Sequence, residues 1–176
     1  MDINDHNYFS LFSLTESFTI DQSFLNVQYR NLQSKFHPDK FVNASDKERL
    51  HALQMASLVN EAFATLRSPV SRIAYILKER GIDPEENIQA HLGEAFLLGQ
   101  MELRDELEQF QEQKNLDGIE NLKNQVQNQK QDFIKSAQSH YENGQYSDIK
   151  PVYNKLQFVE KLLHEINAAE EKLLDY

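Results

Sequence analysis

The sequence contains no cysteine, and among its 176 residues it has only five glycines and four prolines. Without cysteine the chain can form neither a disulfide framework nor a site in which thiolates bind zinc or an iron–sulfur cluster. The scarcity of glycine and proline leaves little room for long loops, and a chain of this length can fold into one or two small globular units. Hydrophobic residues make up 40% of the sequence, which is enough for real cores.

Positive charge is also scarce, because 18 lysines and arginines stand against 28 aspartates and glutamates and give a formal net charge of −10. This balance argues against non-specific binding to nucleic acid or to an anionic membrane surface. No hydrophobic run approaches the ~20 residues of a transmembrane helix. Residues 1–5 are acidic where a secretion or transit signal would be basic. We therefore expect a cytoplasmic protein.

Apolar residues recur at helical spacing through nearly the whole chain, so the sequence predicts an all-α protein. In the first half we expect four helices, of which the first is short and the last runs from Pro69 to Gly81. Each helix is preceded by an N-cap signal. The signal is a side chain that can accept hydrogen bonds from the free backbone N–H groups of the first turn, or a proline at the first helical position. These caps are Asn7, Asp21, Ser45 with Glu48, and Ser68 before Pro69.

The second and third helices of this half carry complementary apolar stripes. We expect the two helices to pack antiparallel, because side chains three and four positions apart share one face of a helix. The loop between them then lies at the tip of a hairpin. One stripe consists of Leu25, Tyr29, Leu32 and Phe36, and the other of Ala52, Met55, Ala56, Val59, Phe63 and Leu66.

The second half predicts a three-helix bundle, joined to the first half by a linker at residues 81–91. Turn signals at residues 115–118 and 142–144 separate the three longer helices. Residues 1–75 hold seven lysines or arginines and eight acidic residues, whereas residues 76–176 hold eleven and twenty. We therefore expect two units with different partners, residues 1–80 and residues 92–176.

The tripeptide His37-Pro38-Asp39 lies in the loop at the tip of the expected hairpin. Its proline lacks an N–H group and disfavours the helical conformation at the residue before it, so the preceding helix should end at Phe36. A three-residue string is a weak signal by itself. Arg30 and Lys35, however, lie on the polar face of the helix that leads into it. This context favours a docking loop over an active site.

Three segments around the tripeptide, Tyr29–Leu32, Lys35–Phe41 and Val59–Leu66, resemble a J-domain, the module that docks on ATPase chaperones of the DnaK class and stimulates their ATP hydrolysis. The resemblance to the HscB family of bacterial iron–sulfur co-chaperones covers essentially the whole chain. It implies two partners, a DnaK-class chaperone of the HscA type and an iron–sulfur scaffold protein of the IscU type. Because the chain has no cysteine, it would handle a cluster that another protein carries, and no resident cofactor is expected. The segments similar to HscB are His37–Phe41, Arg67–Leu77, Phe96–Leu107 and Glu171–Tyr176.

By this resemblance the tripeptide contacts the ATPase chaperone where its nucleotide and substrate domains meet. The basic helix face would pair with acidic residues of the same partner, and salt should weaken such surface charge pairs. We expect His37 to act through shape and hydrogen bonding rather than acid–base catalysis. The expected docking residues are Arg30, Lys35, His37, Pro38, Asp39 and Lys40.

The first helix of the bundle carries a second candidate site. At steps of about 100° per residue, Leu97, Leu98 and Met101 project away from the expected buried face and should face water among charged residues. On the last helix, Phe158 likewise has no obvious place in the core. The expected buried faces consist of Leu92, Phe96, Gly99, Leu103, Leu107 and Phe110 on the first helix, and of Leu156, Val159, Leu163, Ile166 and Leu173 on the last.

An apolar patch with a charged rim is the usual form of a partner site. Periodicity leaves the alternative equally open, namely that the three side chains are buried against the first unit or the linker. The resemblance favours the partner site, because this region binds the scaffold protein in HscB-like proteins. Gly99 stands where relatives can carry a larger charged residue, which softens the rim. The matching positions here are Leu97, Leu98, Met101, Glu102, Asp105 and Phe158.

An enzymatic function finds no support in the sequence. The other five histidines are scattered over separate segments, and the chain has no His-Glu-x-x-His motif, glycine-rich phosphate loop or nucleophile elbow. We therefore expect neither catalytic residues nor a metal site. Two alternatives stay open, a structural helical adaptor in which the tripeptide has no role and a general J-domain adaptor that recruits a DnaK-class chaperone to another client.

Overall fold

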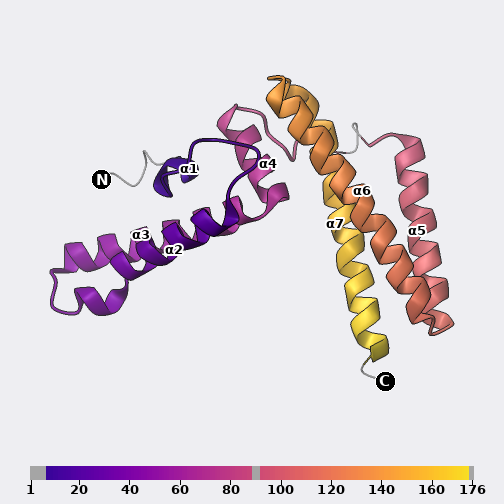
Figure 1. The fold of residues 1–176 in the computed structure, drawn as a ribbon, viewed down its shortest axis with the longest axis horizontal. Coiled ribbons are helices and arrows are strands. Elements are labelled where there is room, and N and C mark those ends of the chain that lie inside the picture. The colour runs from indigo at the N-terminus through magenta and orange to yellow at the C-terminus, as the bar shows by residue number, and fades with distance from the viewer. Residues whose placement is uncertain (1–6, 89–91, 175–176) are drawn as a thin grey trace. The chain divides into compact units, whose positions relative to one another are not determined.

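The computed structural model of the chain describes residues 7–88 and 92–174 (Figure 1). Over these residues it consists of helices and connecting turns, with no strand, which confirms the all-α prediction. The chain divides into two compact units, residues 1–75 and residues 76–176. The acidic N-terminus, the last three residues of the predicted linker and the final two residues of the sequence lie outside the described part.

The first unit is built around a helical hairpin, as predicted. Helices α2 (Gln22–Lys35) and α3 (Asp46–Arg67) lie side by side (Figure 1), and the loop that connects them contains a 3₁₀ helix, η2 (Pro38–Phe41). The short α1 (Tyr8–Leu11) packs on α3, and α4 (Pro69–Glu79) begins in this unit. Because α1 also covers α3, the buried stripe of α3 differs from the predicted one. It consists of Ala52, Met55, Val59, Ala62 and Leu66, whereas Ala56 and Phe63 are half-buried.

Aromatic side chains hold α1 in place. Tyr8 stacks on Tyr75 with ring centroids 4.4 Å apart, and its hydroxyl donates a hydrogen bond to Oε1 of Glu61 at 2.8 Å. Phe9 and Phe12 are buried beside these contacts. The short helix therefore depends on tertiary packing, because four residues are too few for a helix to be stable alone.

The predicted caps form. Oδ1 of Asp21 accepts hydrogen bonds from the backbone N–H groups of Ser23 and Phe24 at 2.8 and 3.0 Å. Ser45 and Glu48 make the reciprocal hydrogen bonds of a capping box, and those from Ser45 lower the pKa of the Glu48 carboxyl. A lowered pKa in the folded state means that this cap stabilises the fold above the unfolded pKa and is lost as the pH falls.

Arg72 is a charged residue inside the first unit. It is 4% exposed, and burial lowers the pKa of its guanidinium to about 10. Its Nε donates to the backbone oxygen of Leu66 at 2.9 Å, and Nη1 donates to that of Phe18. The side chain therefore stays charged at neutral pH and ties the start of α4 to the end of α3 and to the segment before α2.

The second unit contains the predicted three-helix bundle. Its helices are α5 (Glu94–Glu112), α6 (Leu116–Glu142) and α7 (Tyr146–Leu174), with α6 and α7 in the most extensive contact (Figure 1). Leu92, expected on the buried face of the first bundle helix, is buried but precedes α5, because Gly93, with φ at +73°, lies in the left-handed region before the helix. Ion pairs link the helices, with Lys130 Nζ 2.7 Å from Glu160 and Arg104 Nε 2.9 Å from Glu165.

The core of the bundle differs from the predicted stripes on both α7 and α5. On α7, Leu162 is fully buried beside Leu156, whereas Leu163 and Leu173 are half-buried, because α7 packs against both α5 and α6. On α5, Gln100 is buried, while Phe96, Gly99 and Phe110 are half-buried. No helix in the described part of the chain combines the length and apolar character needed to cross a membrane. The buried cluster consists of Leu103, Leu107, Ile119, Leu122, Val126, Val159, Leu162, Ile166 and Ala169.

Replacing Gly118 with alanine is expected to destabilise the bundle by about 1 kcal/mol, a typical cost of overpacking. A Cβ at this buried position would lie 2.7 Å from Cδ1 of Phe110 and 2.8 Å from Nδ2 of Asn115. Urea unfolding measures the effect. As the matched control, Gly99→Ala places its Cβ in open space and should stabilise the helix by up to about 1 kcal/mol. Equal stabilisation by both variants would show that Phe110 does not restrict the site.

Candidate functional site

The loop at the tip of the hairpin has a fixed geometry. His37 adopts an extended backbone conformation and caps η2, and its Nδ1 accepts a hydrogen bond from the backbone N–H of Asp39 at 3.3 Å. The backbone N–H of Lys40 donates to the His37 oxygen at 3.0 Å. Helix α2 ends at Lys35, one residue before the predicted position. The tripeptide is therefore a rigid corner, because proline fixes one dihedral and two hydrogen bonds hold the turn.

The side chains of this corner are open to solvent. Those of His37 and Asp39 are 58% and 87% exposed, and Nδ1 of His37 lies 3.7 Å from Oδ2 of Asp39. Because Nδ1 takes part in the turn, the imidazole presents its ring and Nε2 to solvent. This arrangement suits recognition by shape and hydrogen bonding.

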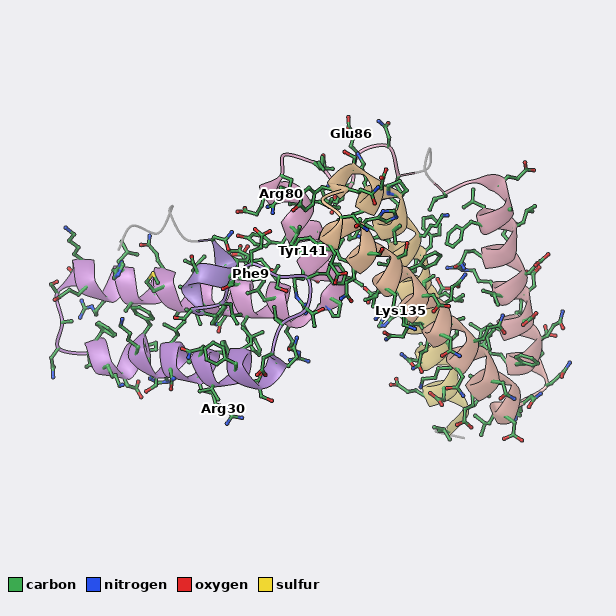
Figure 2. The ribbon with its side chains drawn as sticks, turned by 45° about the horizontal axis from the view of Figure 1, so that its top comes forward. Phe9, Arg30, Arg80, Glu86, Lys135 and Tyr141 are labelled. Atoms are coloured by element: carbon green, nitrogen blue, oxygen red, sulfur yellow. The ribbon has the colours of Figure 1, made fainter. Side chains whose placement is uncertain are left out.

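Five of the six predicted docking residues line one shallow hollow beside the loop, and Lys35 does not line it. The Lys35 ammonium lies 5.3 Å from the centroid of the Phe36 ring, while Nζ of Lys40 donates to Oγ of Ser34 at 3.2 Å. Figure 2 shows the side chain of Arg30 pointing away from the hairpin. The hollow is lined by Arg30, Gln33, Ser34, Phe36, His37, Pro38, Asp39, Lys40, Ala56 and Asn60.

The sequence did not indicate that α3 contributes Ala56 and Asn60 to the lining of this hollow. Tyr29 of α2 stacks on Phe63 with ring centroids 3.9 Å apart, and its hydroxyl donates to Oδ1 of Asn60 at 3.0 Å. These contacts set the register of the hairpin and bring Asn60 and Ala56 opposite the basic face. The only sequence signal was their position one and two turns before Phe63 on the same helix.

The predicted patch on α5 is exposed. Leu97, Leu98 and Met101 are 37%, 52% and 61% exposed, and the acidic residues Glu102 and Asp105 beside them are also exposed. This confirms the predicted exposure of the three apolar side chains. Large apolar side chains grouped beside carboxylates are the composition expected of a partner surface.

Phe158 is not among the buried core residues, but it has a packing partner that the sequence did not indicate. It is half-buried, and its ring packs edge-to-face on Phe96 with centroids 6.2 Å apart. Phe96 in turn packs on Phe133 at 6.0 Å. Phe158 therefore lies at the seam between α7 and α5, where it supports the helix that carries the patch.

The described residues contain no group of three or more histidines and acidic residues that could hold a metal ion. Outside the two surfaces, burial and the charge of Glu85 raise the pKa of Tyr153, where the start of α7 meets the segment before α5.

A family model, curated relatives and solved structures that resemble this chain all belong to one family of proteins. The family model described as the HSCB C-terminal oligomerisation domain matches residues 92–167. A co-chaperone protein HscB homolog from Vibrio campbellii is 36% identical over 169 residues, which cover 96% of this chain and 99% of that protein. The solved structure of chaperone HscB from Vibrio cholerae is 34% identical, with a TM-score of 0.88 over 96% of this chain and 99% of that one. Human co-chaperone protein HscB is 26% identical, with a TM-score of 0.84 over 93% and 82% of the two chains.

Proposed function

The chain belongs to the HscB family of co-chaperones, and from this membership we propose that it acts in iron–sulfur cluster assembly by bridging two proteins. Residues 1–80 are the J-domain, which docks on a DnaK-class chaperone of the HscA type. Residues 92–176 bind an iron–sulfur scaffold protein of the IscU type, and residues 81–91 link the two. The chain has no catalytic activity of its own, and it works in the cytoplasm.

The observation that carries this proposal is the presence of two exposed surfaces of different chemistry in separate units. The hairpin tip is basic and polar, with Arg30, His37 and Asp39 at an exposed hollow. The α5 surface is apolar with an acidic rim, with Leu98 and Met101 as its most exposed apolar side chains. Two such surfaces fit two different partners held at the same time.

The docking residues proposed at the hairpin tip are those predicted from the sequence, and they fall into two groups with different roles. Arg30, Lys35 and Lys40 would pair with acidic residues of the chaperone, which speeds association more than it deepens affinity. The rigid corner of the tripeptide would supply the shape-specific contact. Glu102, Asp105 and the apolar patch would contact the scaffold, with Phe158 supporting the patch from the α7 side.

The segment between the units is anchored to the bundle. Arg80 lies over the ring of Tyr146 with its guanidinium carbon 4.6 Å from the centroid, and Nζ of Lys150 lies 3.5 Å from Glu86. The described part of the proposed linker thus packs with the second unit. This explains why the compact units divide after residue 75 although the proposed J-domain continues to residue 80.

In a steady-state ATPase assay, the wild-type chain is expected to accelerate hydrolysis by the HscA-type chaperone. Adding the scaffold protein together with the chain should accelerate it more than the separate effects combined, because a bridging protein raises the effective concentration of scaffold at the chaperone. Acceleration that the scaffold leaves unchanged would favour a general J-domain adaptor with another client. No acceleration at all would contradict the docking role.

A further inference from the structure

A groove between α5 and α6 adjoins the apolar patch and has an unusual composition. Its polar lining consists of amides and carboxylates, and none of the described residues that line it is basic. Helix α5 contributes two carboxylates on the side of Gly99, because positions three and seven residues apart share a helix face. The polar lining residues are Gln100, Glu102, Glu106, Gln125 and Gln129.

Gln100 is the buried residue of this groove. It is 3% exposed, and its Oε1 has no hydrogen-bond partner. Its Nε2 reaches Oε1 of Gln129 only at 3.5 Å, the long limit of a hydrogen bond. A buried side-chain oxygen without a partner in the chain is free to accept a hydrogen bond from a donor outside the chain.

Arg104, the basic residue of α5 nearest in sequence to Gln100, does not donate to the unpaired oxygen of the Gln100 side chain. Nε of Arg104 lies 2.9 Å from Glu165 on α7, and its Nη1 donates to the backbone oxygen of Gln100 at 3.0 Å. The side-chain oxygen of Gln100 therefore stays unpaired although an arginine is near in sequence. Glu102 and Glu106 also form no ion pair within the part of the chain that the structure describes.

Gly99 leaves the mouth of the groove open. No atom outside its immediate surroundings lies within 4 Å of the position that a Cβ would occupy. A side chain from another protein can therefore cross α5 at this point. Leu98, four positions before Glu102, places the apolar patch directly beside the same point.

We propose that this groove binds an arginine side chain of the protein that covers the apolar patch. A guanidinium has five N–H donors and no acceptor, and its plane matches carboxylates and amide oxygens held side by side. The groove offers the complementary set, with acceptors and negative charge on Glu102 and Glu106 and an unpaired oxygen on Gln100. The identity of the partner as the iron–sulfur scaffold rests on the proposed function, whereas the preference for a guanidinium does not.

The preference is tested on the full wild-type chain with N-acetylarginine amide as the probe. Titration followed by NMR should shift the side-chain amide resonances of Gln100, Gln125 and Gln129 at millimolar probe. The neutral isostere N-acetylcitrulline amide should leave them in place, and Glu106→Gln should reduce the response to arginine several-fold. Absence of shifts, or equal shifts with both probes, would overturn the inference.

A second experiment tests the groove against the scaffold protein by calorimetric titration. Gly99→Leu fills the mouth without straining the helix and should weaken binding about tenfold, the loss of one well-placed contact. Gln131→Leu, an exposed position of α6 outside the groove, should bind as the wild type does. Glu106→Gln should weaken binding more than Glu108→Gln, which removes the same charge from the same helix outside the groove.

The outcomes separate the groove from the proposed function. If Gly99→Leu binds like the wild type while truncation of the apolar patch abolishes binding, the groove inference is wrong and the scaffold assignment stands. If the wild type does not bind the scaffold but the arginine probe shifts the three amides, the groove stands and the scaffold assignment is wrong.

Discussion

His37→Gln is expected to reduce the ATPase rate of the partner chaperone to its basal value while scaffold binding stays at the wild-type level. The imidazole caps η2 through Nδ1 and presents its ring at an exposed corner. Glutamine is flexible and cannot hold the same surface. Losing a central docking contact of about 2 kcal/mol weakens an interaction roughly 30-fold. The fold should change little, because the side chain is exposed.

The measurement is the chaperone's ATPase rate as a function of co-chaperone concentration, beside a calorimetric titration with the scaffold. The control is His164→Gln, which removes an exposed imidazole from α7 and should stimulate as the wild type does. Full stimulation by the His37 variant would remove the docking role of the tripeptide and support the structural adaptor. Loss of both activities with lost helicity would instead mean that the corner is needed for folding.

The fold was largely predictable wherever it depends on neighbours in the sequence. The cap at Asp21 and the box of Ser45 and Glu48 require only residues within four positions, so the sequence contains the whole interaction. The buried faces were less predictable. Whether Leu162 or Leu163 is the more buried depends on how α7 is shared between two other helices, and periodicity along one helix does not report that.

The candidate surfaces divide in the same way. The face of α5 on which Leu97, Leu98 and Met101 lie follows from periodicity along a single helix, although their exposure to solvent required the structure. The position of Phe158 does not, because it depends on the pairing of α7 with α5. The contribution of Asn60 to the docking hollow likewise comes from the register between α2 and α3, which the contact with Tyr29 fixes. The helix face on which a side chain lies can thus be predicted from sequence, whereas contacts between helices require the structure.

Truncation of Leu97, Leu98 and Met101 to alanine together is expected to weaken scaffold binding roughly a hundredfold. Apolar contacts at the centre of an interface cost more than about 1 kcal/mol each when truncated, and about 3 kcal/mol corresponds to that change in Kd. All three side chains are exposed in the free chain, so the bundle should keep its stability. Phe158 is left in place because its packing on Phe96 would mix binding with folding.

Calorimetric titration with the scaffold measures the effect, and thermal unfolding checks the fold. The control truncates three apolar side chains of the first unit that are at least as exposed overall, Val42, Leu50 and Leu53, and should bind the scaffold as the wild type does. Equal loss in both triple variants would mean that apolar surface acts without specificity. Wild-type affinity in the α5 variant would place the scaffold site elsewhere, because no interface centred on this patch could lose all three side chains without weakening.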